Sequence, residues 1–190
     1  MSQIYQPKPD NRKYFDLIQH IKNGAIKIPK FQREFVWEKQ KTADLLDSIL
    51  KGYPIGTIII WKTKERLRSI KNLGNVDLPD TPDGDSVQYI LDGQQRLASL
   101  FVVREGLSLK KDNKDIDYKT IYINLDKDST DPENIVTIEK PDGTSITVHQ
   151  LLNEGAAFIA DNYPRDYLDL IDHYKKRFET YDFSTIVISD

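Results

Sequence analysis

The stretch VQYILDGQQRLASLFVVR, residues 87–104, has the pattern of a strand, a tight turn and a helix in direct succession. Residues 87–91 are apolar and β-branched enough to form a buried strand. Asp92 and Gly93 are residue types of turns and helix caps. From Gln94 onward the apolar positions recur at helical spacing: Leu97, Ala98, Leu100, Phe101 and Val102. The pattern therefore predicts a strand at 87–91 and a helix at 94–104, joined by a polar turn.

The turn from Asp92 to Arg96 has two interpretations. A helix start offers backbone N–H groups and the positive end of the helix dipole, which suit a phosphate. Arg96 would add a planar fork for phosphate oxygens, and Asp92 could hold Mg²⁺ or orient a water. Gln94 and Gln95 suit a polar pocket, because amides are costly to bury unpaired. In the other interpretation Asp92 is an ordinary N-cap and Arg96 is solvated.

Composition indicates a globular chain. Its 190 residues are 38% hydrophobic and 30% charged, enough for one domain or one domain with an appendage. The absence of cysteine excludes disulfides and thiolate metal sites. No apolar run approaches the roughly 18 residues of a membrane span, and no basic-then-apolar leader is visible, so we expect a cytoplasmic protein. Basic residues outnumber acidic ones over 1–66 and the reverse holds over 67–190; the basic half could face nucleic acid or a nucleotide, or be solvated surface.

Hydrophobic periodicity predicts the remaining elements. Helices are expected at 14–22, 38–51, 148–154 and 163–181, and strands at 26–28, 57–62, 119–125 and 185–189. A hairpin is expected from 136–139 and 145–148, an irregular excursion or a hairpin at 64–86, and a charged loop at 107–119. The run at 57–62 is apolar enough to be buried on both faces.

These elements predict a mixed α/β fold. Strands 26–28, 57–62, 87–91 and 119–125 would form a small mixed sheet packed against helices 38–51 and 94–104, with Asp92–Arg96 at the rim. We expect a flexible arm at 1–13, a core domain at 14–125, and a hairpin and helical extension at 126–190. Because the sequence stops on an apolar strand, we expect it to be the N-terminal part of a longer chain.

A second polar motif lies at 29–37, PKFQREFVW. Gln32 and Arg33, beside aromatic residues, could form one wall of a nucleotide or nucleic-acid site. The alternative is a loop pinned into the core by its aromatics, with Arg33 paired to an acid. If the first interpretation holds, Gln32 and Arg33 approach Gln95 and Arg96, because two distant polar motifs would then face one pocket.

Several chemistries find no support in the sequence. It contains no GxxxxGK[ST] or GxGxxG phosphate loop and no serine in a nucleophile elbow. His20, His149 and His173 are scattered without the spacing of metal ligands. Any nucleotide would therefore bind by another route.

Four motifs together resemble one family: IPKFQREFVW (28–37), LLDSILKGYPIG (45–56), TIIIW (57–61) and YILDGQQRLASL (89–100). In order and spacing they are similar to the DGQQR branch of the ParB/sulfiredoxin-like superfamily. That branch includes the S subunit of GmrSD-type modification-dependent restriction enzymes and related phage-defence proteins. The resemblance covers residues 14–105. Many members continue Thr-Thr-Leu where this chain has Ala98-Ser99-Leu100, a mild change on the helix face.

The resemblance implies a ParB-like α/β core that binds a nucleoside triphosphate at Gly93–Arg96 and hydrolyses it with Mg²⁺. DNA cleavage would belong to a separate His-Asn-His nuclease domain or subunit. The implied roles are catalytic for Asp92, Gln94 and Gln95, metal-binding for Asp92, and phosphate-binding for Gln32, Arg33, Gly93 and Arg96. We therefore expect the NTPase part of a restriction-like phage-defence protein. The alternatives are a non-catalytic module that binds DNA or protein, and a structural subunit that docks a nuclease.

Overall fold

The computed structural model describes residues 6–29, 38–73, 76–111 and 114–189. The chain divides into two compact units. The sheet unit comprises Met1–Val36, Gly56–Ala98 and Asp182–Asp190, and the helical unit comprises Trp37–Ile55 and Ser99–Tyr181. The predicted boundary after residue 125 does not separate these units, because the chain enters the sheet unit, leaves it and returns at its end.

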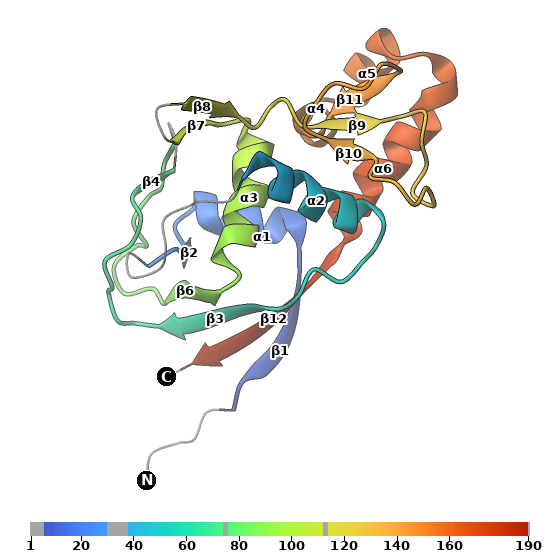
Figure 1. The fold of residues 1–190 in the computed structure, drawn as a ribbon. Helices are drawn as coiled ribbons and strands as arrows, with labels where there is room; N and C mark the ends of the chain where they lie inside the picture. The colour runs from blue at the N-terminus through green and yellow to red at the C-terminus, as the bar shows by residue number, and fades with distance from the viewer. Residues whose placement is uncertain (1–5, 30–37, 74–75, 112–113, 190) are drawn as a thin grey trace. The chain divides into compact units, whose positions relative to one another are not determined.

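A five-stranded mixed sheet forms the centre of the sheet unit (Figure 1). Its order is β1 (Lys8–Lys13), β12 (Asp182–Ser189), β3 (Ile58–Thr63), β6 (Val87–Asp92) and β2 (Ile26–Lys27). β12 runs parallel to β3 and β2 runs parallel to β6, whereas the β3–β6 and β1–β12 pairs are antiparallel. The prediction of a mixed α/β fold with a small mixed sheet is confirmed.

Helix α1 (Tyr14–Lys22) has the predicted bounds and lies over one face of this sheet (Figure 1). It buries one stripe of side chains, consisting of Tyr14, Leu17, Ile18 and Ile21. The ring of Tyr14 lies 6.2 Å from the ring of Phe183 on β12. Burying such side chains contributes about 1.5–3 kcal/mol each to folding, so this stripe fixes the helix on the sheet.

Strand β3 alternates between buried and half-buried side chains. Ile58 and Ile60 have no exposed surface, whereas Ile59 and Trp61 are partly exposed. The expected burial on both faces is therefore wrong for this strand. Only one face of β3 is fully buried. Its side chains therefore alternate between buried and partly exposed, as in a strand with one covered face.

Strand membership of the sheet also differs from the prediction. The segment predicted at 119–125 gives β9 (Tyr122–Asn124), which belongs to a separate sheet in the helical unit. In the five-stranded sheet, β12 occupies the place that we predicted for residues 119–125. Residues 8–13, which we expected in a flexible arm, form β1 and pair with β12. Local pattern shows that a segment suits a strand, but which partner it meets depends on the fold of the whole chain.

The helical unit contains a three-stranded sheet in the order β10 (Val136–Thr137), β9 and β11 (Ser145–Thr147). Val136 and Ile146 both pair with Ile123 of β9, on its two sides. The predicted hairpin of 136–139 with 145–148 is thus wrong, because β9 lies between the two strands. The turn residues allow the chain to reverse, but they do not require the flanking strands to pair.

Helix α2 (Lys39–Leu50) packs against β10 and α6 (Leu168–Thr180) within the helical unit. α4 (Val148–Asn153) and α5 (Ala156–Asn162) complete its helices, while α3 (Gln94–Glu105) contributes residues to both units. The helix predicted at 163–181 begins only at Leu168, after a 3-10 turn at Arg165–Tyr167 that follows Pro164. In the parts of the chain described, no helix has the length and apolarity needed to cross a membrane.

Two further hairpins are present, one within 64–86, where we predicted an irregular excursion or a hairpin, and one within 107–119, where we predicted a loop. β4 (Asn72–Leu73) pairs with β5 (Val76–Asp77), and β7 (Ser108–Lys111) pairs with β8 (Lys114–Asp117). The prediction of a charged loop at 107–119 is therefore wrong. In β7 and β8, Lys110 lies opposite Asp115, and such opposite charges can stabilise a strand pair that has little apolar pattern.

Candidate functional site

The turn after β6 is shaped by a bulge and a glycine. Ile60 pairs with Ile90, but Ile59 pairs with Asp92, so Leu91 is an extra residue in β6. Gly93 follows with φ +86°, a conformation that L side chains rarely adopt. A bulge redirects the side chains beyond it, so together these two features direct the chain from the sheet into α3.

Gly93 occupies the N-cap position of α3. Its carbonyl accepts the first helical hydrogen bond, from the amide of Leu97 at 3.0 Å. Asp92 is one residue too early for this position and is the last residue of β6. The interpretation of Asp92 as the N-cap residue is therefore wrong.

Arg96 links three segments of the sheet unit. Its Nη2 donates a hydrogen bond to the carbonyl of Thr57 at 2.8 Å, and it lies 3.1 Å from Oδ2 of Asp92. The Arg96 side chain is 17% exposed and the Asp92 side chain is 64% exposed. Arg96 is thus not the solvated first-turn residue of the simpler interpretation. Its guanidinium is held in place beside an accessible carboxylate.

Two glycines make room for this guanidinium. A Cβ added at Gly56 would lie 2.6 Å from Nη1 of Arg96, and one added at Gly93 would lie 3.2 Å from Nη2. Both glycines have positive φ, +84° at Gly56 and +86° at Gly93. The turn before β3 and the turn after β6 therefore approach Arg96 closely because neither carries a side chain there.

Of the remaining predicted site residues, the structure describes the two glutamines of α3 and not the two residues of the 29–37 motif. Gln94 is 5% exposed and Gln95 is partly exposed, both in the first turn of α3. A buried amide needs hydrogen-bond partners, which is compatible with the predicted polar surroundings. Gln32 and Arg33 lie outside the described residues. Their approach to Gln95 and Arg96 stays a prediction.

Comparison with known proteins identifies the family of this chain. The profile of the family described as the N-terminal domain of the GmrSD restriction endonuclease matches residues 14–190. The chain belongs to this family. It is also 34% identical, over 96 residues, to the uncharacterized protein MJ0686 of Methanocaldococcus jannaschii. That match covers 48% of this chain and 17% of the relative, so the chain spans only a small part of the length of the relative it matches.

The described part of this chain offers limited means of holding a metal. Among the residues that the structure describes, no group of three or more His, Cys, Asp or Glu side chains is placed to hold a metal ion. Mg²⁺ is usually held by one or two carboxylates together with substrate phosphates and water. The exposed Asp92 carboxylate, with one oxygen engaged by Arg96, fits that weaker mode and does not fit a cage made only of protein ligands.

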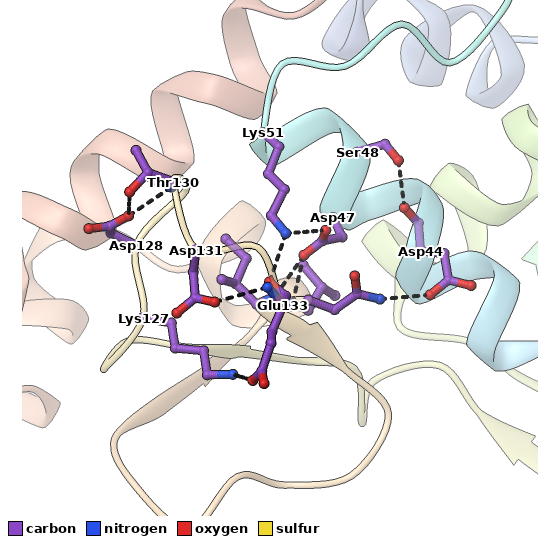
Figure 2. Close-up of polar contacts among 12 residues, drawn as sticks. Asp44, Asp47, Ser48, Lys51, Lys127, Asp128, Thr130, Asp131 and Glu133 are labelled. Carbon is purple, nitrogen blue, oxygen red and sulfur yellow. Dashed lines mark hydrogen bonds and ion pairs between the residues drawn. The ribbon is translucent and has the colours of Figure 1, made fainter.

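A second polar cluster, in the helical unit, is structural (Figure 2). Oδ1 of Asp47 accepts hydrogen bonds from the amides of Ile135 at 2.7 Å and Val136 at 3.1 Å. Oδ2 of Asp47 pairs with Nζ of Lys51 at 3.0 Å, and Lys51 also donates to the Glu133 carbonyl at 2.7 Å. Only 7% of the Asp47 side chain and 5% of the Lys51 side chain are exposed. This buried pair anchors the segment before β10 to α2.

Sequence reasoning missed the carbonyl of Thr57 and the role of Gly56. The only local signal is the turn Tyr53-Pro54-Ile55-Gly56, which indicates a change of direction but no partner. It also missed Asp47 and Lys51, because an acid and a lysine at spacing i and i+4 normally indicate a solvated helix surface.

Proposed function

We propose that this domain binds a nucleoside triphosphate at the turn from Asp92 to Arg96 and hydrolyses it. It would be the nucleotide-dependent part of a DNA-targeting restriction and phage-defence protein whose nuclease lies in a separate domain or subunit. The observation that carries the proposal is the Arg96 guanidinium fixed at the start of α3 beside the accessible Asp92 carboxylate. The family of the chain supports the restriction context. The DGQQR motif supports placement in the ParB/sulfiredoxin-like superfamily.

Each residue of the turn has a distinct proposed role. Gly93 lets the backbone approach the phosphates, and the start of α3 presents the positive end of the helix dipole to them. Arg96 holds a phosphate oxygen with the N–H groups of its five-donor fork. Gln94 and Gln95 bond phosphate or position the attacking water. Gln32 and Arg33 remain candidates for the opposite wall.

Asp92 has the role that depends on Mg²⁺. Its carboxylate would hold the ion together with the phosphates of the nucleotide. When bound, the ion would neutralise negative charge on the phosphates while the terminal phosphoryl group is transferred to water. Because Arg96 contacts Oδ2 of Asp92, the two side chains are coupled, and removing either one would change the position of the other.

Nucleotide binding and phosphate release on paired variants test the proposal. Arg96→Ala should weaken nucleotide affinity about tenfold to a hundredfold, because a charge-assisted hydrogen bond is lost. Asp92→Asn should keep most of the affinity and lose turnover. Lys62→Gln, an exposed change on β3, is the matched control. Folded Arg96→Ala and Asp92→Asn proteins that bind and hydrolyse every nucleoside triphosphate at the wild-type level would refute the assignment.

One observation favours the non-catalytic module instead. Nη2 of Arg96 already has two protein acceptors, Thr57 and Asp92, as expected for a residue whose task is to brace the turn. In that case nucleotide with Mg²⁺ would not raise the melting temperature. DNA binding would be independent of nucleotide and would weaken steeply with salt.

A further inference from the structure

A second polar pocket lies in the sheet unit, and no residue of the Asp92–Arg96 turn lines it. It encloses about 440 Å³. Its charged lining consists of Lys27, Arg66, Arg68, Lys71, Asp80 and Asp83. The basic side chains outnumber the acidic ones in a chain whose net charge is −3, so the pocket is locally suited to an anion.

Two lysines of this pocket share one carboxylate oxygen. Nζ of Lys27 lies 2.9 Å from Oδ1 of Asp80, and Lys71 pairs with the same atom. Lys27 is only 7% exposed, whereas the Asp80 side chain is 70% exposed. Hydrogen bonds from Lys27 and then from Lys71 lower the pKa of Asp80 to about 2. The carboxylate thus occupies a position where two cations converge, one of them buried.

Contacts that do not involve Lys27 or Lys71 hold the backbone around the pocket in place. Gly24 (φ +77°) admits the backbone of Pro79 and Asp80, since an added Cβ would lie 2.7 Å from the Pro79 carbonyl oxygen. The hydroxyl of Thr81 donates to the carbonyl of Gly24 at 2.5 Å. Nη2 of Arg66 donates to the carbonyls of Pro82 at 3.0 Å and of Asp85 at 2.9 Å. Arg66 therefore belongs to the frame of the pocket.

Arg68 differs from the other basic residues of the pocket. It is exposed, and within the described parts of the chain its guanidinium forms no ion pair or hydrogen bond. The segment that carries it is held beside β2, because the amide of Ile70 donates to the carbonyl of Ile28 at 2.9 Å. An anchored backbone thus presents an unengaged guanidinium at the pocket that contains Lys27 and Lys71.

We propose that this pocket binds a phosphate group, which Arg68 and Lys71 contact together with the buried Lys27. The Asp80 carboxylate is the internal anion that the phosphate displaces from the two lysines. The exposure of Asp80 gives its side chain room to turn away. The phosphate could belong to the backbone of DNA or to a small molecule, because Lys and Arg recognise phosphate oxygens in both by the same charge-assisted hydrogen bonds.

The sign of the effect at Asp80 distinguishes this proposal from a purely structural ion pair. Asp80→Asn removes the competing charge, so it should raise affinity for phosphate several-fold. Arg68→Gln and Lys71→Gln should each lower affinity about tenfold at low salt. Lys62→Gln serves as the exposed control in the same unit. Circular dichroism on each variant establishes that it is folded.

Two measurements separate the sources of the phosphate. If the ligand is DNA, fluorescence anisotropy with an unmodified 20-base-pair duplex (about two helical turns) would show a steep salt dependence of binding. The slope of that dependence should fall by about one for each phosphate-binding cation that is replaced. Thermal stabilisation by inorganic phosphate, absent in Arg68→Gln while duplex affinity stays unchanged, would indicate a small ligand.

Two outcomes would overturn the proposal. One is that neither measurement responds to Arg68→Gln and Lys71→Gln. The other is that Asp80→Asn binds both probes no more tightly than wild type does. Nucleotide affinity that depends on Arg96 is measured separately, so failure here leaves the proposed NTP site standing.

Discussion

Arg96 reaches back across the start of α3 to Asp92, so that its Nη2 lies 3.1 Å from the carboxylate and 2.8 Å from the carbonyl of Thr57. One side chain thus joins the end of β6, the first turn of α3 and the residue before β3. These contacts tie the three segments together. Preorganisation of this kind lowers the cost of binding an anion.

Removing Arg96 should therefore affect stability as well as binding. Arg96→Ala should lower the free energy of unfolding by about 1.5–3 kcal/mol, because the Thr57 carbonyl loses a charged donor. Asp92→Asn should cost less than about 1 kcal/mol, since the pair involves a carboxylate that is 64% exposed. Urea denaturation measures both values. Equal losses in the two variants would show that the ion pair, and not the bond to Thr57, dominates.

Substitution of Gly56 tests whether the close approach of its backbone to the Arg96 guanidinium contributes to stability and to nucleotide binding. Gly56→Ala combines a left-handed backbone with a Cβ only 2.6 Å from Nη1 of Arg96. Gly84→Ala is the matched control, because Gly84 has φ +88° and open space around the added Cβ. Both should lose about 1–2 kcal/mol from backbone strain. Gly56→Ala should lose more, and it should also weaken nucleotide binding as Arg96 shifts. Indistinguishable melting temperatures and affinities for the two variants would count against a close fit.

The buried Asp47–Lys51 pair should be more sensitive to loss of the acid than of the base. Asp47→Ala leaves Lys51 buried without its carboxylate and removes the acceptor of two backbone amides. We expect a loss of about 3–5 kcal/mol in unfolding free energy, measured by urea denaturation. Lys51→Met should cost less, because Asp47 keeps those amide bonds.

Asp44→Ala is the control for that series. Within the described parts of the chain, its exposed carboxylate accepts hydrogen bonds only from the side-chain amides of Gln40 and Asn134. We expect its effect to stay below about 1 kcal/mol. If Lys51→Met proves as damaging as Asp47→Ala, the ammonium and not the carboxylate would be the main anchor of the segment before β10.

Tyr174 should make the domain sensitive to alkali. Burial raises the pKa of Tyr174 to about 12, with smaller contributions from the charges of Asp128 and Asp47. An unfolded tyrosine has a pKa of about 10, so the unfolded chain releases its proton first. The contribution of Tyr174 to the free energy of unfolding is therefore fully present below pH 10 and is lost as the pH rises from about 10 toward 12.

Tyr174→Phe isolates this effect. At neutral pH it should cost about 1 kcal/mol, because the hydroxyl donates to the carbonyl of Lys127 at 2.9 Å. Between pH 10 and 12 its unfolding free energy should fall less steeply than that of wild type. Tyr53→Phe, at a residue that is 59% exposed, is the control. A Tyr174→Phe protein with the wild-type alkaline slope would show that other groups cause the loss.

The sequence by itself determined the strand and helix on either side of the turn, two further helices and the chemical character of the turn. Apolar spacing and glycine place the bounds of α1, α2, β6 and α3 to within one residue, because these signals act within a few residues. The family motifs also located the candidate site at Asp92–Arg96. The roles of those residues in binding or catalysis remain predictions.

The tertiary structure decided which segments meet. β12 enters the middle of the sheet, β9 separates β10 from β11, and Thr57 supplies the acceptor for Arg96. None of these is a local property: a strand pattern does not specify its partner, and a backbone carbonyl has no signature in the sequence. An acid and a lysine at spacing i and i+4, as at Asp47 and Lys51, carry no sequence signal for burial. They became a buried pair because the amides of Ile135 and Val136 were brought to the carboxylate, and burial makes such a pair depend on every partner it has.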